Sequence, residues 1–187
     1  MVSERLPNKM TVEEYLAHEQ ETGIKHEYID GEIFAMAGGS RHHTAIITNC
    51  SGELREQVRK KPCQAYTSEI KVKINDLKYV YPDFTVVCDE QEYADEVETM
   101  LVNPTLVGEV MSPSSGDYDQ GTKAGYYRSL PSVQQYLLLN QDKPYAQLFT
   151  RNDIGWQLQE FEGLDAVIPL KPIGCELKLS EAYLDVF

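Results

Sequence analysis

Apolar residues recur with helical spacing in two segments near the start of the chain. Residues 11–20 (TVEEYLAHEQ) begin with Thr11 and have Glu14 three positions later, the signature of a capping box at a helix N-terminus. In residues 43–60 the apolar side chains lie near helical spacing, which predicts an amphipathic helix. These side chains are Ile46, Ile47, Cys50, Leu54 and Val58.

Other segments show the two-residue period of a β-strand or a short apolar run. Residues 68–74 (SEIKVKI) alternate strictly, which predicts a half-exposed strand. One face would carry Ile70, Val72 and Ile74, and the solvent face would carry Glu69, Lys71 and Lys73. Core strands are expected in residues 81–88 (YPDFTVVC) and 105–111 (TLVGEVM), and further strands in residues 132–140 and 145–151.

The order of these elements predicts an α+β fold. A hairpin is expected in residues 25–36, because the dipeptide Asp30-Gly31 favours a tight turn, and a third helix over residues 119–128. The 187 residues are 42% hydrophobic and 25% charged, which is ordinary for a soluble domain. We therefore expect a single domain spanning residues 1–187.

The charge of the chain is unevenly distributed. The net charge of −13 argues against a protein that coats nucleic acid non-specifically, since that affinity depends mainly on Lys and Arg. Residues 41–78 nevertheless hold eight Lys and Arg against four acids, a net of +4, whereas residues 79–109 hold eight acids and no basic residue. The basic segment could contact phosphates, or both segments could be ordinary solvated faces.

Neither the first thirty residues nor any later segment has an apolar run long enough for a signal peptide or a membrane span. We expect a cytoplasmic protein that does not enter membranes. Its four cysteines are Cys50, Cys63, Cys88 and Cys175, and they form no CxxC pair. Reduced thiols are therefore expected in preference to a disulfide framework or a zinc site.

Glu109 lies inside the apolar run of residues 105–111, where a buried carboxylate needs compensation. Asp83 begins the other core strand, and neighbouring strands lie about 4.8 Å apart, so the two acids could converge on one cation. Magnesium typically takes one or two carboxylates together with waters and phosphates. Alternatively, Glu109 could pair with a buried Lys or Arg, or lie on a strand that faces water.

Several motifs together resemble one known family. The segments EEYL, KHEYIDGEI, GGSRHHTAI, SEIKVKI, YPDFTVV, LVGEVMSPSS and YDQGTKAGYYRSLPSVQQYLLL follow one another between Thr11 and Phe149. In order and spacing they resemble the Uma-two family of restriction endonuclease-like proteins, a branch of the PD-(D/E)XK nuclease superfamily. The resemblance implies a mixed central β-sheet flanked by helices, with the site where the strands of Asp83 and Glu109 diverge at the open edge of the sheet.

The resemblance also implies roles for individual residues. Pro82-Asp83 is similar to the PD motif and Glu109 to the acid of the (D/E)XK element, which makes Asp83 and Glu109 the ligands of Mg²⁺ or Mn²⁺. Such an ion would polarise a scissile phosphate and generate a nucleophile from water. Glu27 would have an accessory acidic role, and His43 stands at a family-like position.

The sequence departs from the superfamily pattern at Met111, where a lysine usually stands two residues after the acid. A thioether can neither carry positive charge to a phosphate nor orient a hydroxide. In several branches of the superfamily the lysine is displaced to a neighbouring helix, and Lys123 is the candidate here. Lys123 would point toward the two acids if residues 112–118 fold back, and toward solvent if they do not.

Other polar residues are weaker candidates. Glu69 and Lys71 are expected on a solvent face, although their strand should neighbour that of Asp83, so Lys71 could touch a phosphate. His42 and His43 could assist proton transfer, but a capping or surface role fits them better. Tyr127 is interpreted as a packing aromatic.

Two functions remain open at this point. The first is a magnesium-dependent endonuclease that hydrolyses DNA, with Asp83, Glu109 and Lys123 as its catalytic residues. The second is a weak or inactive nuclease-fold protein that binds nucleic acid or protein, which Met111 favours. A homodimer is implied by the resemblance alone, because nucleases of this superfamily often pair to address two strands.

Overall fold

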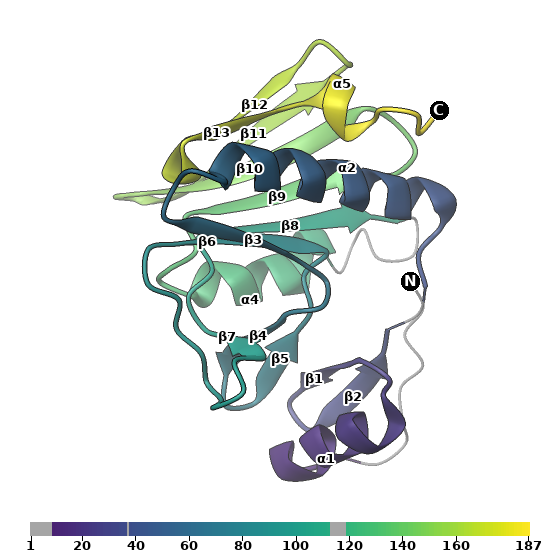
Figure 1. Ribbon diagram of the computed structural model, residues 1–187, viewed down its shortest axis with the longest axis vertical. Coiled ribbons are helices and arrows are strands. Elements are labelled where there is room, and N and C mark those ends of the chain that lie inside the picture. The colour runs from purple at the N-terminus through teal and green to yellow at the C-terminus, as the bar shows by residue number, and fades with distance from the viewer. Residues whose placement is uncertain (1–8, 37, 113–118) are drawn as a thin grey trace.

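A six-stranded sheet lies at the centre of the computed structural model, which describes residues 9–36, 38–112 and 119–187 (Figure 1). Its strand order is β11-β10-β9-β8-β6-β3. β8 and β9 run parallel and the other neighbours antiparallel, so the sheet is mixed, as predicted. The strands are β3 (Cys63–Thr67), β6 (Phe84–Cys88), β8 (Leu106–Met111), β9 (Gln135–Asn140), β10 (Tyr145–Asn152) and β11 (Gly155–Glu162).

Two smaller sheets complete the strand structure. A five-stranded sheet has the order β2-β1-β5-β4-β7, and β12 pairs with β13 in a two-stranded sheet. Their strands are β1 (His26–Ile29), β2 (Glu32–Ala35), β4 (Lys71–Asn75), β5 (Lys78–Val80), β7 (Met100–Leu101), β12 (Val167–Leu170) and β13 (Cys175–Lys178). The sequence did not predict this division of the strands into separate sheets.

Helices cover both faces of the central sheet (Figure 1). Helix α2 (Arg41–Val58), β12, β13 and α5 (Leu179–Ala182) pack on one face. Helix α4 (Ala124–Ser129) packs on the other face and contacts the five-stranded sheet as well. Apolar side chains of β8 alternate between the two cores, with Leu106 and Val110 toward α2 and Val107 and Met111 toward α4. No helix in the described part of the chain is both long and apolar enough to cross a bilayer.

The local signals in the sequence correspond to real elements. Helix α1 (Val12–Thr22) begins with the predicted capping box, in which Glu14 N donates to Thr11 Oγ1 (3.2 Å) and Thr11 N donates to Glu14 Oε2 (2.8 Å). The β1–β2 hairpin turns at Asp30 and Gly31, both with positive φ. The prediction of a helix over residues 43–60 is confirmed by α2.

The expected surroundings of Lys71 were wrong. Its strand β4 pairs with β5 and β7, and not with β6, which follows Asp83. The Lys71 side chain is buried, with Nζ 2.6 Å from Glu19 Oε2 and 4.6 Å from the centre of the Tyr15 ring. The five-stranded sheet is therefore covered by α1 on the face that alternation alone assigned to solvent.

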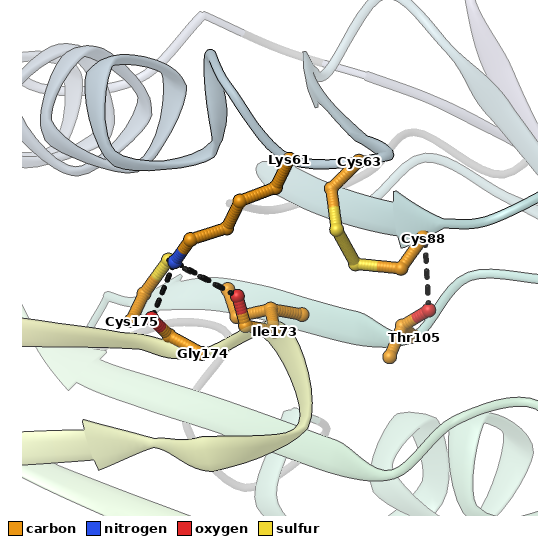
Figure 2. The surroundings of a disulfide bond; sticks show 7 residues. All are labelled: Lys61, Cys63, Cys88, Thr105, Ile173, Gly174 and Cys175. Atoms are coloured by element: carbon orange, nitrogen blue, oxygen red, sulfur yellow. Dashed lines mark hydrogen bonds between the residues drawn. A yellow bond between two sulfur atoms is a disulfide. The ribbon is translucent and has the colours of Figure 1, made fainter.

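The expectation of four reduced thiols was also wrong. Cys63 and Cys88 form a disulfide, because the antiparallel register of β3 and β6 places them directly opposite each other (Figure 2). Cys50 and Cys175 remain free thiols, and the Lys61 ammonium donates to Cys175 Sγ at 3.3 Å. Sequence spacing did not reveal the pair because β3 had not been predicted as a strand.

Gly108 allows β6 and β8 to pack closely beside the two acidic residues. It is paired with Phe84, and a Cβ at position 108 would collide with the Phe84 ring. We expect Gly108→Ala to lower the free energy of unfolding by about 1–3 kcal/mol, because the ring must move in a packed core. Urea denaturation measures the change.

Gly52→Ala in α2 is the matched control, because a Cβ there meets no atom within 4 Å. In mid-helix this change should stabilise the protein by about 0.5–1 kcal/mol. Equal stability of Gly108→Ala and the wild type would contradict the packing of Phe84 against Gly108.

Candidate active site

Asp83 and Glu109 lie where the pairing of two central strands ends. The last residue pair between β6 and β8 is Phe84 with Gly108, so Asp83 directly precedes it on one strand and Glu109 directly follows it on the other. Val110 N donates a 2.7 Å hydrogen bond to Asp83 Oδ2. Both acids are buried. The two strands stop pairing with each other at this point, as expected, but both are interior strands of the sheet, and Glu109 itself still pairs with Leu138 of β9.

Glu109 is compensated by two neighbours. Lys123 Nζ lies 2.8 Å from Glu109 Oε1, and the Tyr127 hydroxyl donates to the same oxygen at 2.8 Å. Burial raises the pKa of Glu109 well above its usual value, Lys123 counteracts this, and the charges of Asp83 and Asp119 raise it further. The alternative of a buried ion pair is thus realised.

Lys123 points into the acidic cluster, as expected, because of the local shape of its helix. Asp119–Lys123 form a π-helical turn, η1, that continues into α4, and single π turns are frequent at functional sites. The buried ammonium also lies 2.8 Å from Glu27 Oε1. Burial lowers the pKa of Lys123, but the carboxylates of Glu109 and Glu27 more than offset this and raise it well above the usual value.

Two predicted accessory residues join this cluster. Glu27 lies on β1, and its ion pair with Lys123 connects the five-stranded sheet to the site. His43 lies in the first turn of α2, which begins after the capping residue Ser40, and its Nε2 is 3.3 Å from Asp83 Oδ2. Burial lowers the pKa of His43, but the hydrogen bond and charge of Asp83 outweigh it, so the pKa is raised.

The other two accessory candidates lie elsewhere. Glu69 is exposed and pairs with Lys25 at 2.6 Å, and Lys71 pairs with Glu19. Neither is hydrogen-bonded or ion-paired to Asp83, Glu109 or Lys123 in the described part of the chain. The Lys71–Glu19 pair instead links β4 to α1, and the Lys25–Glu69 pair links the residue before β1 to the turn before β4.

The carboxylate oxygens of Asp83 and Glu109 are donors that suit a hard divalent cation. Asp83 uses Oδ2, and Glu109 uses Oε1, for their hydrogen bonds from described residues, so Asp83 Oδ1 and Glu109 Oε2 accept none from these residues. Within the described residues, no group of three or more His, Cys, Asp or Glu side chains is arranged to hold a metal. Magnesium or manganese would thus rely on two carboxylates, with waters or phosphate oxygens as the remaining ligands.

Comparison with known proteins places this chain in a family. The model of the Uma2 family, described as "Putative restriction endonuclease", matches residues 12–182. The chain belongs to the Uma2 family. Two uncharacterized proteins of Synechocystis sp., slr1290 and sll1609, are 35% and 32% identical to it over 178 and 161 residues. These alignments cover 94% and 85% of this chain and 92% and 91% of the relatives.

A solved structure has the same fold as this Uma2 protein. It is described as the crystal structure of a "putative nuclease" belonging to DUF820 from Anabaena variabilis. The two superimpose with a TM-score of 0.77 over 95% of this chain and 99% of the other, at 19% sequence identity. The restriction endonuclease-like α+β fold inferred from the Uma2 motifs agrees with this likeness.

The sequence of this Uma2 chain did not reveal the contacts that Tyr127 and Met111 make. Tyr127 was considered a packing aromatic, yet its hydroxyl contacts Glu109. Its position four residues after Lys123 on one helix face was the signal that could have revealed it. Met111, at the usual lysine position, packs beside α4, and its Sδ accepts a hydrogen bond from Gln120 at 3.2 Å.

Proposed function

We propose that this protein is a metal-dependent endonuclease that hydrolyses phosphodiester bonds in DNA. The observation that carries the proposal is the convergence of Lys123 on Glu109, beside Asp83, at one end of the β6–β8 pair. Membership of the Uma2 family, whose description names a restriction endonuclease, supports the same reaction class. Lys123 would supply the positive charge that Met111, at the usual lysine position, cannot provide.

Each residue of the site would have a distinct role in the reaction. Asp83 and Glu109 would hold Mg²⁺ or Mn²⁺, which supplies Lewis acidity and lowers the pKa of a bound water. Lys123 would stabilise negative charge that develops on the scissile phosphate. His43 would orient Asp83, and Tyr127 would orient Glu109, because each donor contacts one oxygen of its acid and leaves the other oxygen to bind the ion.

The second candidate is a nuclease fold that binds nucleic acid or protein without cleaving it. The positions of the basic residues favour a protein partner over nucleic acid for this candidate, since most side chains of the basic segment already have partners. Lys71, Lys73, Lys78 and Arg59 pair with carboxylates, and Lys61 donates to backbone carbonyls. Few cations of this segment, such as Arg55 and Lys60, are left for phosphates, so specific binding would depend on a small local patch.

Nicking of supercoiled plasmid DNA separates the two candidates. The proposal predicts that the wild type converts supercoiled plasmid to open circles in Mn²⁺ or Mg²⁺ and stops when EDTA is added. A single-stranded RNA of matched length, tested under the same ions, decides between DNA and RNA as substrate. Gel-shift binding to DNA without any nicking would support the binding protein instead.

A homodimer is part of this proposal, because two copies of one site can address both strands of a duplex. We expect light scattering to give twice the chain mass of 21.3 kDa, and the mass should not depend on Mn²⁺. A mass equal to one chain at the concentrations used for nicking would contradict paired action. In that case single nicks, and not double-strand breaks, would be the main product.

A further inference from the structure

Lys123 is shared between two carboxylates from different sheets. Its Nζ lies 2.8 Å from Glu27 Oε1 on β1 and 2.8 Å from Glu109 Oε1 on β8. All three side chains are largely shielded from solvent. Because both contacts are made at once, Lys123 can lose one carboxylate and keep the other without leaving the site.

The cluster holds more negative charge than one ammonium neutralises. Glu27 Oε1 and Glu109 Oε1 each lie 2.8 Å from the one ammonium of Lys123, and Asp83 adds a further carboxylate beside the last residue pair of β6 and β8. A divalent cation would relieve the surplus. The bound cation and the Lys123 ammonium are both positively charged, so they repel each other and compete for the negative charge of Glu109.

We propose that Lys123 is a built-in counter-ion that competes with the metal for Glu109, and that Glu27 is the positioning residue that retains Lys123 when the metal binds. The inference rests on the proposed metal site and adds a role for Glu27. Glu27 would act through Lys123 and not as a metal ligand. The same contact would keep the ammonium available to a phosphate in the metal-bound protein.

Mn²⁺ affinity is the test, measured at pH 8 from the electron paramagnetic resonance signal of free Mn²⁺. Lys123→Met should bind Mn²⁺ at least about tenfold more tightly than the wild type, because the competing charge is gone. Lys123→Gln keeps a hydrogen-bond donor to Glu109 and should show the same direction if Lys123→Met folds poorly. Lys143→Met is the matched control, since Lys143 pairs with Glu162 on the surface and should leave affinity unchanged.

Glu27→Gln tests the second half of the proposal. With Lys123 confined to Glu109, Mn²⁺ should bind about fivefold more weakly than in the wild type. In the Lys123→Met background the same change should have a much smaller effect, because the two residues act as one unit. An equal loss in both backgrounds would make Glu27 a direct contributor and overturn its positioning role.

The outcomes separate this inference from the proposed function. Unchanged or weaker Mn²⁺ binding by both Lys123→Met and Lys123→Gln overturns the counter-ion, even if the wild type nicks DNA. If the Lys123 variants bind Mn²⁺ more tightly but the wild type does not nick DNA, the counter-ion role of Lys123 is supported and the nuclease function is contradicted. Absence of Mn²⁺ binding in the wild type and in both Lys123 variants overturns both.

Discussion

Asp83→Asn and Glu109→Gln are each expected to slow metal-dependent nicking by about a thousandfold or more, equivalent to about 4 kcal/mol of transition-state stabilisation. Each change removes one of two carboxylates available to the ion and keeps the shape of the side chain. The fold should survive Glu109→Gln, because Lys123 retains Glu27 as a partner and a buried charge is removed. Initial nicking rates in Mn²⁺, with circular dichroism of each variant, provide the measurement.

Glu69→Gln is the matched control for this experiment. Glu69 is an acid of the same type, but its side chain is 80% exposed and pairs with Lys25 away from the acid pair. Its nicking rate should equal that of the wild type. Retained cleavage in Asp83→Asn or Glu109→Gln would remove that residue from the metal site.

Opening the Cys63–Cys88 disulfide is expected to lower the free energy of unfolding by about 3 kcal/mol. The bond links residues 25 positions apart in sequence and ties the edge strand β3 to β6 (Figure 2). Its main effect is to restrict the unfolded chain, so the loss should appear in the double variant Cys63→Ser/Cys88→Ser. Urea denaturation with and without dithiothreitol measures it.

Cys175→Ser provides the control for the disulfide, because Cys175 is a free thiol. Its stability should respond to dithiothreitol as much as that of the wild type does. The double variant should not respond at all. Equal stability of the oxidised wild type and the double variant would show that the bond contributes nothing, and the chain would then be equally stable in a reducing cytoplasm.

Elements with local signals could be predicted from the sequence. The capping box of Thr11 and Glu14, the Asp30-Gly31 turn and the apolar spacing of α2 all involve residues close in sequence. Strand β8 was recognisable because its apolar run is buried on both faces. Such features depend on backbone preferences and periodicity, which a single sequence contains.

Features that depend on distant partners could not be predicted. The Cys63–Cys88 pair requires the register of β3 with β6, and the burial of Lys71 requires α1 to cover β4. A period of two in β4 shows that two faces differ, but not that the second face is covered by another element. Separate sheets likewise arise from packing between segments far apart in the chain.

The site could be predicted only in part, because some of its contacts are made between segments far apart in the chain. Family motifs indicated Asp83, Glu109 and Lys123, and Glu27 and His43 as accessory residues, and the structure brings all five into one connected cluster. Glu69 and Lys71 were included because β4 was expected beside the strand of Asp83. The role of Tyr127 depended on the direction of one hydroxyl, which apolar patterning does not reveal.

Calorimetric titration of Mn²⁺ into the wild type and into the double variant Asp83→Asn/Glu109→Gln tests the central claim most directly. The proposed site predicts saturable binding by the wild type and none by the double variant, with both proteins folded. Identical titrations for the two proteins, or no binding by the wild type, would contradict a metal site where the β6–β8 pairing ends. Glu109 would then be compensated by Lys123 and Tyr127 alone.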